Sequence, residues 1–424
     1  MRRLLFIFSF LSLLVVDGKA QEVETLTLED CLRIGIDNNL SLEGKRKEIQ
    51  KSKYGVSENR SKLLPQITVI AGYNNNFDPP VSVTDGSSYG VPYNITKTLQ
   101  HTANAGLEMQ MPLFNQTLYT SMSIAKVMEE ISRLSYGKAR EDIIMQISKM
   151  YYLGQVTAEQ IVLIKANITR LEELRDITQA FFDNGMSMEV DLKRVNINLE
   201  NLKVQYDNAQ AMMKQQLNML KYIMDYPAEK EFVLTPVNTD SITTVALTGL
   251  SENIYELQLS QSQVQLAEKQ KKIISNGYIP SLSLTGSWRY AAYTDKGYHW
   301  FHSGPSNHWF RSYGLGLTLR IPIFDGLDKT YKIKKAMIDI ENSKVAWENA
   351  RKSLQTQYLN AVNDLMNNQR NFKKQKDNYL LAEDVYTVTS DRYREGIASM
   401  TEVLQDEMQM SEAQNNYISA HYNY

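Results

Sequence analysis

The segment Met111-Pro112-Leu113-Phe114-Asn115 sets the architecture of this chain, because it returns later as Ile321-Pro322-Ile323-Phe324-Asp325. Two other landmarks recur in the same order and at similar distances along the sequence: Pro65 with Pro280, and Gly185 with Gly396. Proline and glycine interrupt regular structure, so each landmark indicates the end of an element. We therefore interpret the chain as one structural unit that is present twice.

Long proline-free tracts separate the landmarks, 113–226 in the first half and 323–424 in the second. In the first tract, apolar residues recur at alternating steps of three and four: Leu192, Val195, Leu199, Leu202, Tyr206, Ala209 and Met213. The second tract repeats this pattern with one acidic position: Val403, Asp406, Met410, Ala413, Tyr417 and Ala420. This spacing is typical of a coiled-coil seam, so both tracts predict long helices that pack along narrow apolar stripes.

Four shorter segments read as strands, at about 66–77, 101–111, 281–293 and 311–321. Apolar side chains alternate in them with small or polar ones, which predicts a sheet with one apolar and one polar face. On the polar face we expect Glu108, Arg289 and Arg320. Each segment has about the ten residues that a tilted strand needs to cross a bilayer. A half-buried sheet of a water-soluble protein gives the same alternation.

Two further features favour the membrane interpretation. Residues 1–20 read as a secretory signal, because Arg2 and Arg3 precede an apolar run and Gly18-Lys19-Ala20 supplies a cleavage site. That run is shorter than a transmembrane helix. Aromatic residues crowd the ends of the third and fourth strands, as in the girdle of a membrane barrel: Trp288, Tyr290, Tyr293, Trp300, Phe301, Trp309, Phe310 and Tyr313. Four strands cannot close a barrel, since the smallest known barrels have eight. The chain would have to associate, and spacing alone does not choose between two and three copies.

Composition excludes several classes of function. The formal net charge is −2 and no block of basic residues occurs, which argues against a nucleic-acid partner. The sequence has no P-loop, His-Glu-x-x-His, Cys-x-x-Cys or Gly-x-Ser-x-Gly motif, so we expect neither an enzyme nor a cofactor. His299, His302 and His308 lie close together, and an aromatic surface loop is favoured there over a metal site. The single cysteine, Cys31, is expected to be buried as a small apolar residue.

Gly185 and Gly396 each follow a long helical tract, where a left-handed glycine cap is common. Asp191 and Glu402 follow them by six residues, within the first turns of the next predicted helix. One interpretation is that these carboxylates stabilise the positive end of the helix dipole. Another is that several copies form an acidic ring at the mouth of a tube, which would attract cations. The two interpretations do not exclude each other.

These residues together resemble the outer-membrane efflux protein family, the TolC-like exit ducts of Gram-negative bacteria, over essentially the whole mature chain. The motifs of the first half are Leu26-Thr27-Leu28-Glu29-Asp30-Cys31-Leu32, Asn38-Asn39, Leu63-Leu64-Pro65-Gln66, Met111-Pro112-Leu113-Phe114, and Asn184-Gly185 with Asp191-Leu192. Those of the second half are Tyr278-Ile279-Pro280-Ser281-Leu282, Ile321-Pro322-Ile323-Phe324-Asp325-Gly326, Tyr393-Arg394-Glu395-Gly396 and Glu402-Val403-Leu404.

The resemblance implies a mainly α fold with a small β part. An internally duplicated long-helix unit would form a trimeric periplasmic α-barrel tunnel, joined to a twelve-stranded outer-membrane β-barrel with four strands from each chain. The first repeat would span 21–235, with long helices at about 116–221, and the second 236–424, with long helices at about 327–424. The family usually continues past Tyr424, so the final helix would be shortened in this chain.

The resemblance also implies the function and the partners. The chain would be a passive outer-membrane channel of a tripartite system, with a long periplasmic extension. It would carry drugs, metals, peptides or proteins from an inner-membrane pump to the exterior. Its partners would be two further copies of itself, a periplasmic adaptor, the pump and outer-membrane lipid. The alternative is an exported coiled-coil structural or adhesive surface protein with a small membrane anchor, which leaves the second strand pair unexplained.

Three groups of site residues follow from the resemblance. The adaptor would dock at two helix-turn tips, Asn184, Gly185, Met186, Ser187 and Glu395, Gly396, Ile397, Ala398, Ser399. At the periplasmic gate, Tyr393 and Asp191 match a locking pair and Glu402 matches a lumen acid. Ala398 stands where a basic locking residue can occur, and Gln405 where a second lumen acid can occur. Glu108, Arg289 and Arg320 would face the lumen of the barrel.

Overall fold

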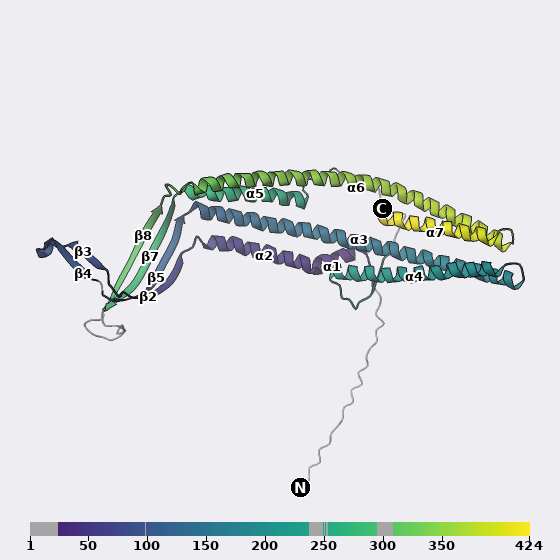
Figure 1. The fold of residues 1–424 in the computed structure, drawn as a ribbon, viewed down its shortest axis with the longest axis horizontal. Helices are drawn as coiled ribbons and strands as arrows, with labels where there is room; N and C mark the ends of the chain where they lie inside the picture. The colour runs from purple at the N-terminus through teal and green to yellow at the C-terminus, as the bar shows by residue number, and fades with distance from the viewer. Residues whose placement is uncertain (1–23, 98, 237–248, 250, 252, 295–307) are drawn as a thin grey trace, which may run out of the picture. The chain divides into compact units, whose positions relative to one another are not determined.

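The computed structural model describes residues 24–424, apart from 98, 237–248, 250, 252 and 295–307 (Figure 1). The predicted signal at 1–20 and most of the histidine-containing loop therefore lie outside the described residues. The helices are α1 (Leu28–Asn38), α2 (Leu40–Ser61), α3 (Gln116–Asp183), α4 (Glu189–Met224), α5 (Tyr255–Ser275), α6 (Asp328–Arg394) and α7 (Met400–Asn423). The strands are β1 (Glu24–Leu26), β2 (Gln66–Asn75), β3 (Val81–Asp85), β4 (Tyr93–Lys97), β5 (His101–Phe114), β6 (Phe232–Leu234), β7 (Ser281–Thr294) and β8 (His308–Arg320).

The chain forms two compact units, and neither coincides with one half of the sequence. Unit 1 consists of 1–40, 140–247 and 360–424, and unit 2 of 41–139 and 248–359. The long helices α3 and α6 contribute residues to both units, since they contain 68 and 67 residues. The predicted long helices are therefore confirmed, and so is the mainly α character of the fold. The division into repeats at 21–235 and 236–424 stays a prediction.

Unit 2 contains a four-stranded antiparallel sheet in the order β2-β5-β7-β8. Its strands are the four that the sequence predicts, although β8 begins earlier, at His308, and β5 extends to Phe114 through a register shift after Pro112. A separate hairpin of β3 and β4 follows β2, and the sequence analysis did not predict it. Its strands have only five residues each, which is short for a pattern of alternation to be recognised.

The cross-strand register gives the sheet two chemically different faces. One row of partners is Val69, Leu107, Trp288 and Tyr313, and the neighbouring row on the opposite face is Thr68, Glu108, Ser287 and Gly314. The apolar face is uncovered in this structure: Val69 is 73% exposed, Tyr313 78% and Leu315 79%. Arg311 is an exception to the predicted separation, because it lies two residues from Tyr313 on the same face and contacts that ring.

Unit 1 has two apolar cores. The larger one is formed by α3, α4, α6 and α7, and it includes the predicted seam residues Val195, Leu199, Val403, Met410 and Tyr417. The smaller core joins α1 to α3 and α4 and contains Cys31, which is fully buried as expected. Burial raises the pKa of the Cys31 thiol to about 12, so the sulfur is an inert apolar group.

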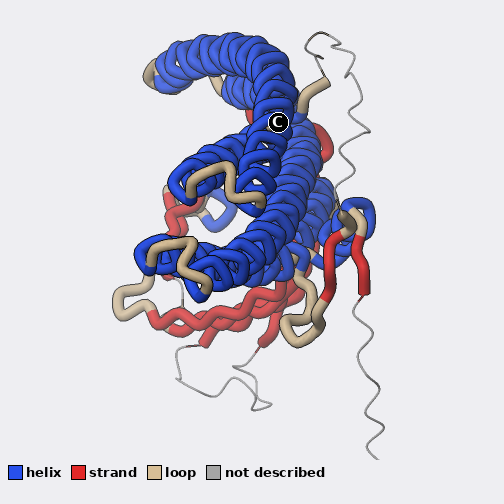
Figure 2. Tube along the Cα trace, turned by 90° about the vertical axis from the view of Figure 1, so that its right-hand side faces the viewer, coloured by secondary structure: helices blue, strands red, loops and turns tan. Residues whose placement is uncertain are grey.

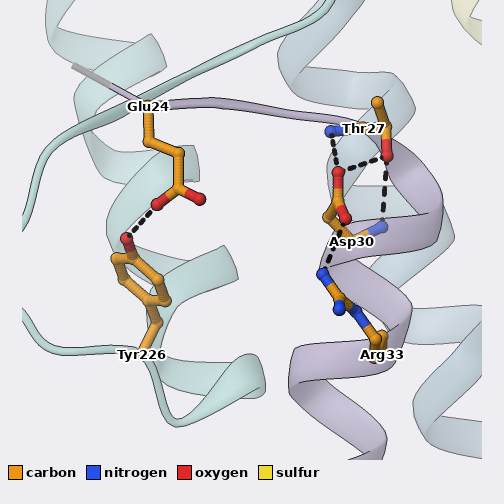
Figure 3. A network of polar contacts seen from close by, with 5 residues as sticks. All are labelled: Glu24, Thr27, Asp30, Arg33 and Tyr226. Atoms are coloured by element: carbon orange, nitrogen blue, oxygen red, sulfur yellow. Dashed lines mark hydrogen bonds and ion pairs between the residues drawn. The ribbon is translucent and has the colours of Figure 1, made fainter. Parts of the chain in front are cut away.

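The start of α1 shows why this helix begins at Leu28. Thr27 and Asp30 form a capping box, in which the amide of Asp30 donates to the Thr27 hydroxyl at 3.2 Å and the amide of Thr27 donates to the Asp30 carboxylate at 3.3 Å (Figure 3). The Thr27 hydroxyl and Arg33 also donate to Asp30, and these contacts hold its pKa below its ordinary value. Nearby, the Tyr226 hydroxyl donates to Glu24 at 3.4 Å, tying β1 to the end of α4.

Candidate functional site

Short loops, drawn in tan, connect the paired helices of unit 1 (Figure 2). Gly185 lies in the loop between α3 and α4 and Gly396 in the loop between α6 and α7, as the sequence predicts. The φ angles of Gly185 and Gly396 are 72° and 74°, in the left-handed region that a side chain disfavours. At the first turn, Gly185 donates to the Phe182 carbonyl at 2.9 Å and Met186 donates to the Phe181 carbonyl at 2.7 Å. At the second turn, the amides of Gly396 and Ile397 donate to the carbonyls of Tyr393 and Arg392 at 2.9 and 2.8 Å. Both turns are Schellman motifs, which satisfy the last carbonyls of the preceding helix.

The helices that leave the two turns begin differently. Ser399 caps α7 in a capping box with Glu402, whose amide and carboxylate make 3.3 Å hydrogen bonds with the Ser399 hydroxyl and amide. Met188 occupies the same place before α4 and makes no side-chain cap. The carboxylate of Asp191 instead pairs with Arg194 at 3.3 Å. Both acids therefore have local structural partners at the start of a helix.

Tyr393 lies inside the hairpin core, only 6% exposed. Its hydroxyl donates to the Thr178 hydroxyl at 3.5 Å, and its ring lies 5.5 Å from that of Phe181. In the described part of the chain no hydrogen bond or ion pair joins Tyr393 to Asp191. The structure thus connects α6 to α3 through Tyr393, while the role of Tyr393 and Asp191 as a lock stays a prediction.

The predicted docking tips expose several apolar side chains. Met186 is 69% exposed and Ile397 62%, and Met188, the residue after the first predicted tip, is 70% exposed. Ala398 differs from them, because it packs partly buried against the hairpin core. Asn184 closes its own turn by donating to the Ala180 carbonyl at 2.8 Å, and Gln405 is exposed. Ser187 and Glu395 complete these tips, and Glu395 is exposed.

The polar face of the sheet carries the predicted lumen residues. Glu108 of β5 and Arg289 of β7 form a close ion pair across the two strands. A hollow of about 530 Å³ surrounds the pair and is lined mainly by hydroxyl, amide and glycine residues, which include Thr68, Gln110 and Gly314. Arg320 is the last residue of β8 and lies opposite Ser281 on the same face of the sheet. The structure therefore brings Glu108 and Arg289 together and keeps Arg320 apart from them.

A partly buried polar cluster, which the sequence analysis did not identify, lies between α3, α6 and α7. Arg170 donates to Glu383 at 2.9 Å and to Asn167, whose amide donates to Gln414 at 2.5 Å. Glu407 is 5% exposed beside this cluster, and burial raises its pKa although the charge of Arg170 opposes the shift. Sequence spacing could not reveal this cluster, because Arg170 and its partner Glu383 lie more than 200 residues apart in the chain.

A second feature missed in the sequence is an aromatic stripe along α6. Phe372, Tyr379, Tyr386 and Tyr393 recur at steps of seven and are all buried. Near its start, the Phe372 ring stacks on Tyr417 of α7 at 5.7 Å. A step of seven is a coiled-coil signal, and a search for aromatic residues alone would have found it.

Two common kinds of membrane or metal feature do not occur among the described residues. No helix in this part of the chain is long and apolar enough to cross a membrane. Among the same residues, no group of three or more histidine, cysteine, aspartate or glutamate side chains is placed to hold a metal ion.

Comparison with known sequences finds a matching family and similar proteins. The model of the family described as outer membrane efflux protein matches residues 34–224 and 238–424. The outer membrane protein TolC of Vibrio cholerae serotype O1 is 21% identical over 382 residues, which are 87% of this chain and 81% of that relative. TolC of Salmonella enteritidis is 19% identical over 87% of this chain and 73% of that protein.

Solved structures share the fold. The outer-membrane channel OprN superposes with a TM-score of 0.75 at 15% identity, covering 93% of this chain and 86% of OprN. The outer membrane protein VceC of Vibrio cholerae has a TM-score of 0.72 at 14% identity, covering 93% of this chain and 92% of VceC. The family match supports an exit duct and does not support the alternative of an adhesive surface protein. The chain belongs to the outer membrane efflux protein family, and it is an outer-membrane exit duct of efflux systems with a periplasmic tunnel.

Proposed function

We propose that three copies of this chain assemble into one duct, whose twelve strands form a closed barrel in the outer membrane. The observation that carries this proposal is the sheet of unit 2. Its apolar face is uncovered, and its edge strands β2 and β8 have no neighbour in the described chain. Edge strands with free backbone groups require a partner in lipid, where water cannot satisfy them.

The number of copies follows from the size of the enclosed space. Two chains would supply eight strands, and the interior of an eight-stranded barrel is filled by side chains. Three chains would supply twelve, which leaves room for water and cargo along the polar face that carries Glu108 and Arg289. Cargo would pass through this space without chemical change.

The mass of the assembly tests the proposal. Full-length protein purified in detergent should have the protein mass of three chains by light scattering. On an electrophoresis gel, its trimer band should be replaced by a single-chain band after boiling. A monodisperse monomer that retains its β signal would contradict the proposal, because four strands would then be stable in detergent without closure.

We also propose that a periplasmic adaptor docks at the tips and thereby connects the duct to an inner-membrane pump. Met186 and Ile397 support this proposal, since exposed apolar side chains at the ends of rigid hairpins suit a protein contact. Met186→Lys combined with Ile397→Lys should abolish efflux of a pump substrate in cells while trimers still form. Met212→Lys is the matched control, because Met212 is 53% exposed in the middle of α4. Normal efflux in the double variant would show that the adaptor docks elsewhere.

The periplasmic gate of the duct would be formed by residues near the same turns: Asp191, Tyr393, Glu402 and Gln405. Thr178 joins this set, because it accepts the hydrogen bond of Tyr393 and links α3 to α6. The exposed carboxylate of Glu402 would face the lumen and would favour cations there.

A further inference from the structure

The polar face of the sheet has an uneven distribution of charge. Along the described strands β2, β5, β7 and β8, the charged residues on this face are Glu108, Arg289 and Arg320. Two of them form an ion pair, so their charges cancel at any distance that is large compared with their separation. The net charge of the face is therefore that of Arg320.

The geometry of the backbone keeps the ion pair in place. Arg289 lies opposite Gly106 in the register of β5 and β7. A Cβ on Gly106 would lie 2.8 Å from the Cα and 2.9 Å from the Cγ of Arg289. Because Gly106 has no side chain, the arginine can run across β5 and reach Glu108. The two side chains stay 45% and 41% exposed, so they face the space in front of the sheet.

Arg320 is far from this pair. Its partner Ser281 is six residues along β7 from Ser287, the partner of Glu108. At about 3.3 Å per residue, the rows are about 20 Å apart, which exceeds the screening length of about 8 Å at physiological salt. Arg320 is exposed and makes no ion pair in the described part of the chain. The nearest acids in sequence, Asp325 and Asp328, pair with Lys329 at 3.1 Å and Lys332 at 2.7 Å.

Closure of the barrel would not neutralise Arg320. In the proposed trimer, β8 of one copy pairs with β2 of the next. Strand β2 has no charged residue between Gln66 and Asn75. The next copy therefore offers no carboxylate from its strand to the guanidinium.

We propose that Arg320 determines the charge preference of the barrel lumen. Three copies form a ring of guanidinium groups at the end of the sheet where the strands meet the helices, and this ring favours solutes that carry carboxylate, sulfate or phosphate groups. The Glu108–Arg289 pairs contribute no net preference while they are intact. This inference rests on the proposed trimeric duct.

Reversal potentials in a KCl gradient across planar bilayers test the inference on the full-length trimer. Arg320→Gln should lower the permeability of chloride relative to potassium by at least about twofold, and Arg320→Lys should keep it. Glu108→Gln exposes Arg289 and should raise the same ratio, whereas Arg289→Gln exposes Glu108 and should lower it. The variant with both changes should return to the wild-type ratio, because neither charge is then present.

A cysteine at position 320 tests the effect of charge independently of folding, because the charge is added after the trimer has assembled. Arg320→Cys trimers, modified after assembly, should become more selective for potassium with an anionic methanethiosulfonate reagent and should return toward the wild-type ratio with a cationic one. The native Cys31 is fully buried and gives the unmodified background. An unchanged ratio in Arg320→Gln and in both modified forms would overturn the inference. Wild-type protein that forms no conducting trimer would instead overturn the proposed duct itself.

Discussion

The hydroxyl of Tyr417 donates a 2.7 Å hydrogen bond to Oε1 of Glu159, and so joins α7 to α3 inside unit 1. The ring nitrogen Nδ1 of His421 lies 2.7 Å from the other carboxylate oxygen. Burial acts to raise the pKa of Glu159, but the hydrogen bonds from His421 and Tyr417 outweigh it and lower the pKa below 4.5. The folded state therefore stabilises the ionised carboxylate.

Tyr417→Phe should lower the free energy of unfolding by about 1.5–3 kcal/mol at pH 7, because it removes a hydrogen bond to a charged group. The aromatic stacking on Phe372 remains in this variant. A lowered pKa contributes stability above the unfolded value of 4.5 and loses it as the pH falls below that value, so the penalty should shrink in acid. Urea unfolding followed by the helical signal measures both effects. Tyr422→Phe is the control, because its ring is 55% exposed, and it should leave the free energy of unfolding unchanged. An equal loss of stability in this control would contradict the role given to the Tyr417–Glu159 hydrogen bond.

Glu407→Gln should stabilise the protein at pH 8 and have no effect near pH 4. Burial raises the pKa of Glu407 from 4.5, with the charge of Arg170 acting against the shift. A raised pKa contributes stability below the unfolded value, and this contribution is lost as the pH rises through the folded value. The melting temperature of both proteins between pH 4 and pH 8 is the measurement. If the melting temperatures of wild type and variant differ by the same amount at every pH in this range, Glu407 does not titrate within it.

Glu402→Gln should change the cation selectivity of the conducting trimer without a change in its melting temperature. Glutamine keeps the hydrogen bond of the capping box with Ser399, so the substitution removes the charge and little else. Selectivity is measured from reversal potentials in bilayers. Glu412→Gln serves as a comparison, since Glu412 is an exposed acid on the same helix without a role in capping. Identical selectivity of Glu402→Gln and wild type would remove Glu402 from the lumen.

Gly106→Ala should destabilise the sheet by about 1–3 kcal/mol, because the added methyl group would meet backbone atoms. Its Cβ would lie 2.4 Å from the carbonyl oxygen of Trp288. Gly314→Ala is the matched control on the same face, where no atom lies within 4 Å of the added Cβ. The temperature at which trimers dissociate on heating is the readout. Equal values for the two variants would show that the strands move apart at no cost.

The elements with a repeating pattern were predictable from sequence. The sheet strands follow from a period of two and the α4 seam from steps of three and four, and both match the structure. Side-chain partners were not predictable in the same way. The hydrogen bond from Tyr393 to Thr178 was not predicted, because it joins two helices whose relative rotation is set by packing along their length. The pairing of Tyr393 with Asp191 stays a prediction. Glu402 lies in the first turn of a helix, as predicted, and the structure adds its capping box with Ser399, while its place at the lumen stays a prediction.

In the described chain no strand pairs with the outer edges of β2 and β8, and this has a consequence for biogenesis. A newly exported chain that has formed its helices still offers two rows of unpaired amide and carbonyl groups, and any extended polypeptide could add to them. In the proposed assembly only the meeting of several copies removes this hazard, so the last step of folding is a reaction between molecules. Its rate should depend on how densely chains arrive at the membrane, and slow delivery should favour degradation over insertion.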